Sequence, residues 1–340
     1  MIAGHYRGNT CQAEFAHSWG VTDGRISEPH PYTGTPRRHE SRRHAVPAHG
    51  DRRPHDHHHH GTMTTIFGDV VDVRPLFPRE RHAMLGLLTT LTPDDWSKPT
   101  VCPGWDVHDV VAHVLNDYTR RLSGTRDGYG GAVFADDETL PRYLARVNDQ
   151  FVQAARQIGP KVMIDLLDHL GPQLDAMWAA QDLEAPAHLD VSWAATNVPS
   201  PTWLDIAREY TEFWVHQQQI RDAVSTPGAD DPTLISPVLD TFARALPHAL
   251  RHEHPPEGTT VTLEATGPAG GTWSATRHST HWALSSPSAA TPAAHISMNQ
   301  DTLWRLATRG ITVAEARART ESTGDHALTA AATTLLAIVA

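Results

Sequence analysis

The sequence predicts an α+β protein in which a helical bundle is followed by a smaller domain that mixes strands with helices. Three observations predict this class. Apolar residues recur at helical spacing through most of residues 75–224, short alternating runs separated by Gly, Pro or Ser occupy residues 259–299, and the end of the chain is helical again. We therefore expect a bundle at residues 63–228 and a small α+β domain at residues 229–340.

Length, charge and cysteine content narrow the class of protein. At 340 residues the chain can bury a sizeable core and is long enough for about two domains. Its net charge of −11, from 28 Lys and Arg against 39 Asp and Glu, argues against a nucleic-acid-binding surface. The sequence shows no apolar run of transmembrane length and no signal peptide, and its two cysteines, Cys11 and Cys102, are far apart. We therefore expect a cytoplasmic protein, a monomer or homodimer, without a nucleic-acid or membrane partner.

Residues 1–62 differ in composition from the rest of the chain. They are rich in Arg, His, Pro and Gly and show no period of either 2 or 3.6 residues. Their apolar content is too low to offset the conformational entropy lost on folding, so we expect a disordered leader. The four histidines at residues 57–60 could hold a divalent metal loosely, as any His-rich tract can. The folded chain is expected to begin near Met63.

The first part of the bundle is predicted from leucine spacing and a capping residue. Residues 75–91 carry an apolar leucine stripe. Thr92 is expected to be the N-cap of a short helix whose first residue is Pro93. The connector PTVCPGW, residues 99–105, contains both Pro and Gly and should be irregular.

Longer helices are expected to complete the bundle. One runs from an N-cap at Asp106 to a stop at Gly124, with its valines and leucines on one face. The others are expected over residues 140–158, 161–181 and 203–224. Amphipathic helices joined by loops of moderate length are typical of a bundle.

The second domain is predicted to combine both kinds of element. Its elements are expected to be a helix over residues 236–251, strands over 259–267, 271–277, 281–286 and 294–299, and helices over 300–310, 312–320 and 325–340. The terminal Ala- and Leu-rich helix is expected to cover the small sheet.

A carboxylate and an imidazole lie four residues apart in REYTEFWVHQQQIRDA, residues 208–223. Glu212 and His216 should be stacked on one face of their helix, because an α-helix turns about 100° per residue. The apolar side chains of this helix lie on the opposite side. His113 has the same relation to the apolar face of the helix that begins at Asp106.

Two interpretations of these polar stripes remain open from periodicity alone. In the first interpretation each stripe faces solvent. Alternatively, the two stripes border one wet cleft between helices, a setting that suits a catalytic metal with an open coordination position. Two His and one Glu are a known ligand set for catalytic Zn²⁺. In this second interpretation Asp109 and Asp117 could orient His113, although surface carboxylates are the commoner case.

The stretch WSKPTVCPGWDVHDVVAHVLNDYTRRLSG, residues 96–124, resembles the start of the mycothiol-dependent maleylpyruvate isomerase family, which is related to DinB-like proteins. The family signature W…P…CPGW-x-V-x-D-V-x-x-H is matched from Trp96 through His113. The E-x-x-x-H pair described above also matches. The tail, from DTLWRLATRG to the end, resembles the family's sterol-carrier-like domain. The resemblance covers roughly residues 70–340.

This resemblance implies a DinB-like four-helix bundle followed by a sterol-carrier-like α+β domain. It implies that His113, Glu212 and His216 bind a divalent metal, usually zinc, and that mycothiol is the thiol cosubstrate. The implied activity is a metal- and mycothiol-dependent transferase or isomerase, in which the metal activates the thiol as a thiolate for attack on an electrophile. The alternatives are a non-catalytic small-molecule-binding or regulatory protein, and a metal-dependent hydrolase that activates water.

Several positions outside the proposed ligand set bear on this resemblance. Arg305 and Arg309, one helical turn apart, are candidates for binding an anionic cosubstrate. The family often has Asp three residues after the second metal-binding His, where this chain has Gln219. It often has Gly-Arg at the end of the C-terminal helix, where this chain has Arg309 and Gly310. Cys102, in the connector, is expected to be a small buried group and not a nucleophile.

Overall fold

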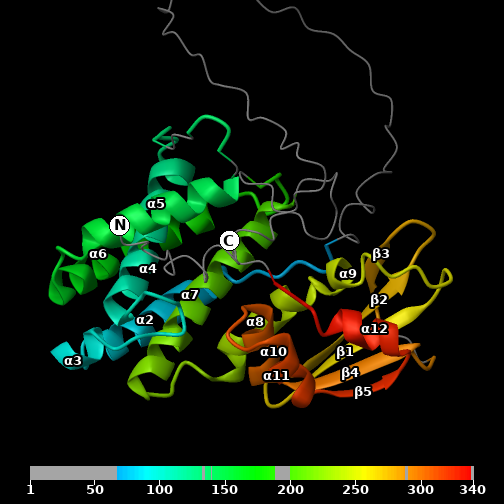
Figure 1. Cartoon of the computed structure of the whole chain (residues 1–340). Coiled ribbons are helices and arrows are strands. Elements are labelled where there is room, and N and C mark those ends of the chain that lie inside the picture. The colour runs from blue at the N-terminus through cyan, green and yellow to red at the C-terminus, as the bar shows by residue number, and fades with distance from the viewer. Residues whose placement is uncertain (1–66, 132–134, 139, 188–199, 288–289, 338–340) are drawn as a thin grey trace, which may run out of the picture.

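The computed structural model describes residues 67–131, 135–138, 140–187, 200–287 and 290–337. A group of helices on one side adjoins a sheet with its own helices on the other side (Figure 1). The expected α+β class, with a helical bundle ahead of a small α+β domain, is confirmed. The leader expected at residues 1–62, with its histidine tract, lies outside the described residues.

The bundle is built from helices that pack against α4 and α2. Helix α4 contacts α5, α6 and α7, and α2 contacts α6 and α7. Aromatic side chains fill the centre, where the Phe77 ring stacks on Trp178 at 5.4 Å and meets Tyr210 and Phe213 edge-on. The elements are η1 (Arg74–Leu76), α2 (Phe77–Leu88), α3 (Pro93–Trp96), α4 (Val107–Arg121), η2 (Leu122–Arg126), α5 (Leu140–Ala155), α6 (Pro160–Ala179) and α7 (Thr202–Val224).

Capping residues set the helix starts as expected, but one predicted stop is wrong. Thr92 and Asp106 each accept a hydrogen bond from the backbone N–H three residues on, and each forms a capping box. Gly124 does not end its helix, because the chain continues beyond Arg121 through the π-helical turn η2. Gly124 lies inside this turn and is not among the glycines with positive φ, so it does not act as a left-handed cap.

The second domain contains a five-stranded mixed sheet with the strand order β3-β2-β1-β4-β5. Strands β1 and β4 are parallel, and the other neighbours are antiparallel. The four expected strands are present as β1 (Thr260–Thr266), β2 (Gly271–Arg277), β3 (Trp282–Ser285) and β4 (Ala294–Asn299). The fifth, β5 (Glu321–Gly324), was not expected, since its exposed residues ESTG lack an apolar alternation and it forms only by pairing with β4.

The first helix of this domain begins earlier than expected and is followed by a separate short helix, and the later helices end sooner than expected. They are α8 (Pro232–Ala243), α9 (Leu246–Ala249), α10 (Gln300–Ala307), α11 (Val313–Ala318) and α12 (His326–Ala332). Helix α12 contacts β1 and β4, so the expectation that a terminal helix covers the sheet is confirmed. Among the described residues, every helix is too short or too polar to span a lipid bilayer.

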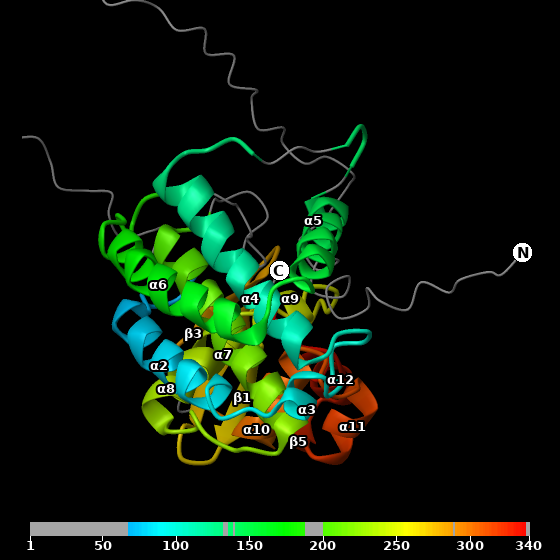
Figure 2. The same ribbon diagram turned by 90° about the vertical axis from the view of Figure 1, so that its left-hand side faces the viewer.

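Helix α7 lies between the other bundle helices and the sheet domain in both ribbon views (Figures 1 and 2). It contacts α2, α4 and α8. In the middle of α7 the Trp214 ring meets Trp304 of α10 edge-on at 5.3 Å, and near the end of α7 Asp222 pairs with Arg305 at 2.8 Å. The boundary expected between residues 228 and 229 stays a prediction, because α8 packs on α7 as well as on β2.

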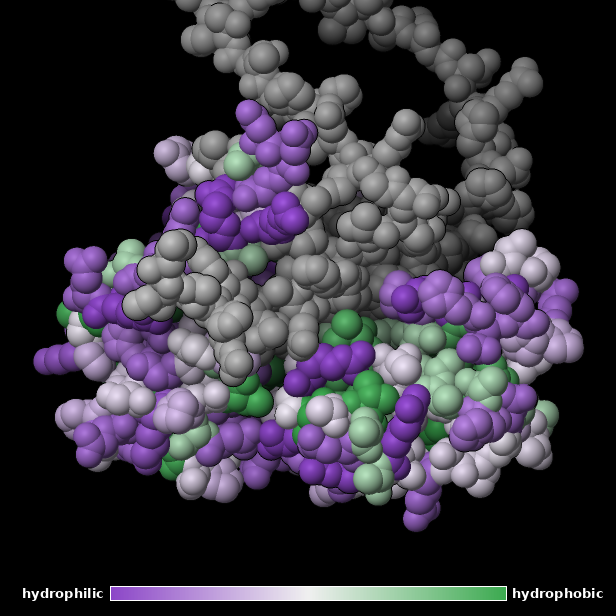
Figure 3. Space-filling model, viewed as in Figure 1, coloured by the Kyte–Doolittle hydropathy of each residue, from purple (hydrophilic) through white to green (hydrophobic). Residues whose placement is uncertain are grey.

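The face seen in Figure 3 is mostly hydrophilic, and its apolar residues form small separate groups. Large apolar side chains are instead concentrated in a core shared by the bundle and the sheet domain. The exposed large hydrophobic residues of the described chain are Val70, Val101, Tyr129 and Val162. These four are scattered along the sequence and come from different segments, as is common on protein surfaces.

A buried carboxyl on α2 makes the stability of the bundle depend on pH. Burial raises the pKa of Glu80 from 4.5 to about 7, although the side chain of Gln217 donates to it at 2.9 Å. Because the folded-state pKa of Glu80 lies above its unfolded value, Glu80 contributes stability that is fully present below about pH 4.5. This stability is lost as the pH rises through about 7.

Replacing Glu80 by Gln should therefore raise the free energy of unfolding at pH 8, by up to ~3 kcal/mol, and change it little at pH 4.5. Glutamine keeps the acceptor oxygen for Gln217 and removes the buried charge. Chemical denaturation of both proteins at the two pH values measures this difference. The exposed Glu184→Gln change is the control and should show no pH-dependent gain. A gain of equal size at both pH values would contradict the prediction.

Candidate metal centre

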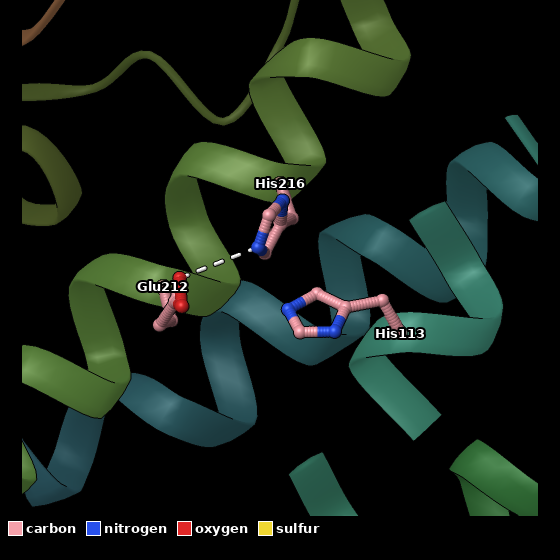
Figure 4. A group of neighbouring side chains, drawn as sticks. All are labelled: His113, Glu212 and His216. Atoms are coloured by element: carbon pink, nitrogen blue, oxygen red, sulfur yellow. Dashed lines mark ion pairs between the residues drawn. The ribbon is translucent and has the colours of Figure 1, made fainter. Parts of the chain in front are cut away.

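The three predicted ligands, distant in sequence, come together between α4 and α7 (Figure 4). His113 is contributed by α4, while Glu212 and His216 are one turn apart on α7. One ligand atom from each residue lies within 4.8 Å of those of the other two. His216 Nε2 is 3.3 Å from Glu212 Oε2, and the two imidazole rings are 4.7 Å apart at an angle of 84°. The side chains point toward one shared space in Figure 4.

The polar stripes of α4 and α7 that carry His113, Glu212 and His216 are buried, so the interpretation of them as solvated helix faces is wrong. The exposed fractions of His113, Glu212 and His216 are 2%, 6% and 3%. Helix α7 is covered on all sides, and nearly all of its side chains are buried, including the acidic ones opposite its apolar face. A helical projection gives the direction of a side chain but not the neighbouring helix that will cover it.

Local structure explains why His113 points into this space. The capping box at Asp106 fixes the start of α4, and His113 follows about two turns later. The ring of Trp105, the last residue of the connector, lies 5.3 Å from the His113 ring. The aromatic contact and the helix start together limit the directions that the imidazole can adopt.

The charges at the site suit a cation. Burial lowers the pKa of His113 well below its usual value, and neighbouring His216 and Arg120 lower it further, so this imidazole is neutral with a lone pair available. Burial also lowers the pKa of His216, but Glu212, Gln219 and Asp117 together outweigh it and raise the net value to about 9. Binding of a divalent metal would therefore displace a proton from the His216–Glu212 pair.

The donor set fits a catalytic zinc ion. His216 Nε2 is buried and, although it forms the ion pair with Glu212, it has no partner with hydrogen-bond geometry in the described part of the chain. Leaving a buried polar atom without a hydrogen bond costs about 1–3 kcal/mol, which coordination to a metal would offset. Two imidazoles and one carboxylate are one of the three-ligand sets found in catalytic zinc sites.

Of the two carboxylates considered as supports for His113, only Asp117 lies beside it. Asp117 Oδ2 is 3.6 Å from His113 Nε2, whereas Asp109 pairs with Arg156 at 3.1 Å. Burial raises the pKa of Asp117 to about 6, against the opposing effect of Arg120, whose Nη2 donates to Asp117 Oδ1 at 2.6 Å. His113 and Asp117 are four residues apart on α4, the same spacing as Glu212 and His216 on α7, so the sequence already indicates that they share a helical face.

A buried group of charges next to the site was missed by sequence reasoning. Arg121 of α4 donates to both Asp205 and Glu209 of α7, at 2.8 and 2.9 Å. Its guanidinium also lies 5.4 Å from the centre of the Trp178 ring. The spacing of Asp205, Glu209 and Glu212 indicates one acidic face on α7, but nothing local indicates which cation faces it.

A second group of possible ligands, Asp106, His108 and Asp109, also lies within 4.8 Å. Asp106 and Asp109 are engaged in the capping box of α4, and Asp109 also pairs with Arg156. His108 Nε2 is 2.8 Å from the carbonyl oxygen of Ile158. These contacts account for the group as helix capping and loop anchoring.

Arg305 and Arg309 are not part of the three-residue group. Arg305 pairs with Asp222 and Asp301, at 2.8 and 2.9 Å, and lies over the Trp304 ring. Arg309 has a positive φ of 57° and donates to main-chain carbonyls, including that of Thr334 at 3.0 Å. Their expected role in binding an anionic cosubstrate stays a prediction.

Comparison with known families supports the assignment of the helical region. Residues 77–221 match the model described as the mycothiol maleylpyruvate isomerase N-terminal domain. The helical bundle belongs to this family. All three residues of the candidate metal centre lie inside the matched segment of this isomerase-family domain.

Two solved structures are also similar to the chain. One is described as the crystal structure of the mycothiol-dependent maleylpyruvate isomerase, with 13% identity and a TM-score of 0.43. The other is described as a histidine-to-alanine mutant of that enzyme, with 12% identity and a TM-score of 0.42. Each alignment covers 68% of this chain and 86% of the chain in the solved structure. No curated protein matches the sequence.

Proposed function

We propose that this protein is a metal-dependent enzyme that uses a low-molecular-weight thiol, mycothiol, to attack an electrophilic small molecule, as a transferase or an isomerase. The observation that carries the proposal is the buried convergence of His113, Glu212 and His216 from two helices of a domain in the mycothiol maleylpyruvate isomerase family. These three residues would hold the metal, and zinc suits the donor set best.

A thiol is a poor nucleophile when protonated, and a bound zinc ion supplies a thiolate at neutral pH. The chain's own residues contribute orientation and charge. Glu212 places a carboxylate against His216, and the buried Asp117 Oδ2, 3.6 Å from His113 Nε2, adds a second carboxylate beside the site. Cys102 is 1% exposed and contacts Gln219, so it is not placed to act as the nucleophile.

Thiol conjugation tests this proposal directly. The purified protein, incubated with mycothiol and an electrophilic bimane, should accumulate the mycothiol conjugate faster than the uncatalysed reaction, as followed by mass spectrometry. The His113→Ala protein is the matched control and should give only the uncatalysed rate.

Equal rates for the two proteins would remove the transferase proposal and favour a non-catalytic binding role. Hydrolysed bimane that accumulates equally well when mycothiol is omitted would favour metal-dependent hydrolysis by activated water instead.

A further inference from the structure

Three consecutive glutamines follow His216 on α7, and each has a different partner. Gln217 Nε2 donates to Glu80 on α2, and Gln218 Nε2 donates to the carbonyl of Gly228 at 3.0 Å. Gln219 instead places its Oε1 2.8 Å from His216 Nδ1. Since each step along the helix turns the side chain by about 100°, only the third glutamine returns to the face that carries His216.

The contact with Gln219 decides which nitrogen of His216 is available to a metal. An amide oxygen can only accept, so Nδ1 must carry the proton that it donates to Gln219 Oε1. In the neutral ring the lone pair then lies on Nε2, the nitrogen that faces Glu212. With the amide turned round, its N–H groups would face Nδ1 and favour the tautomer that cannot bind a metal through Nε2.

A second donor holds the amide in the required orientation. Cys102 Sγ lies 3.3 Å from the same Gln219 Oε1, and its thiol donates to that oxygen. Both side chains are buried, with exposed fractions of 1% for Cys102 and 3% for Gln219, so bulk water does not compete for these bonds. Turning the amide would point its N–H groups at Nδ1 and at the Cys102 sulfur, which is only a weak acceptor, in place of the two hydrogen bonds that its oxygen accepts.

We propose that Gln219 is a positioning residue for the metal centre: its amide oxygen, fixed by the Cys102 thiol, holds His216 in the tautomer that presents Nε2 to the metal. The connector PTVCPGW would then support both imidazoles, because Cys102 acts on His216 through Gln219 while Trp105 packs against His113. This inference rests on the proposed metal-dependent function.

The test compares zinc affinities, measured by competition with a chelator, for the wild-type chain and variants of similar shape. Gln219→Met keeps the length of the side chain but has no strong acceptor, and should weaken zinc binding about 10–100-fold. Gln219→Glu keeps the acceptor oxygen and should bind zinc at least as tightly as the wild type. Gln218→Met, one residue away with its own carbonyl partner, is the matched control and should bind as the wild type does.

If Gln219 only stabilised the fold, its loss would show as lower stability of the metal-free protein. We instead expect the thermal unfolding midpoints of metal-free Gln219→Met and Gln218→Met to fall by similar amounts, while the zinc affinities of the two variants differ. Should Gln219→Met fail to fold, Cys102 provides the same test from the other side. Cys102→Ser keeps a donor and should bind zinc within about 3-fold of the wild type, whereas Cys102→Ala should bind it more weakly, by up to about 10-fold.

Three outcomes would contradict the inference, and they separate the positioning role from the proposed function. Wild-type affinity in both Gln219→Met and Cys102→Ala, with zinc bound by every protein, would overturn the positioning role and leave the proposed function intact. A wild-type chain that binds no divalent metal would overturn the proposed function, and the positioning role with it. Equal loss of zinc affinity in Gln218→Met and Gln219→Met would also overturn the positioning role.

Discussion

Replacing His113 by Ala is expected to reduce the bound zinc from one equivalent to nearly none. The change removes one of three buried ligands, which should weaken binding by more than the roughly 10–100-fold lost when only a supporting residue is changed. Glu212→Gln and His216→Ala should behave in the same way, because each of these residues also supplies one ligand atom to the group. Elemental analysis of the four purified proteins measures the loss.

The control for this experiment is a histidine on the same helix. His108 lies on α4, five residues before His113, and contacts a main-chain carbonyl outside the three-residue group. His108→Ala should retain one equivalent of zinc. A weak chelator should be present throughout, since the histidines at residues 57–60 could also hold metal. If every ligand variant kept one equivalent under these conditions, the assignment of the metal centre would be wrong.

Replacing Arg121 by Met is expected to destabilise the protein by about 3–5 kcal/mol at pH 7. The exposed fractions of the Arg121, Asp205 and Glu209 side chains are 11%, 7% and 6%. Methionine would fill much of the volume and leave two buried carboxylates without the cation that both contact. The free energy of unfolding from chemical denaturation measures the effect.

This loss should be smaller at pH 5 than at pH 7. Burial already raises the pKa of Glu209 and Arg121 lowers it, so without Arg121 this folded-state pKa would rise further, and a raised pKa costs stability only as the pH rises through it. The control is Arg126→Met, which removes a solvent-exposed pair with Asp127 and should change the free energy of unfolding little. Similar losses for the two variants would show that the buried group does not stabilise the fold as described.

Much of the bundle could be predicted because its signals are local. Thr92 and Asp106 start their helices by accepting hydrogen bonds from residues three positions away, and the structure confirms both. Strand β5 could not be predicted, since ESTG is exposed and gains its conformation from β4, more than twenty residues earlier. Gly124 was misjudged because a glycine stops a helix only when the chain adopts a left-handed conformation there.

The candidate site also has features that the local sequence indicates and others that depend on packing. The spacing of Glu212 and His216 indicated that these two side chains could share a cation. His113 was a candidate third ligand from its place on the polar stripe of its own helix, and the family resemblance favoured the ligand interpretation over solvated faces. Periodicity could not show that all three would be buried, nor that Arg121 would face the acidic side of α7.

By itself, the sequence determined the helices, most of the strands and the pairs of side chains that share a helical face, because these depend on residues a few positions apart. The tertiary structure alone decided what lies opposite each face. The hydrogen bond between Cys102 and Gln219, which are 117 residues apart, is a contact of this kind. Burial and long-range contacts are set by how helices pack after they form, and that packing depends on the whole chain at once.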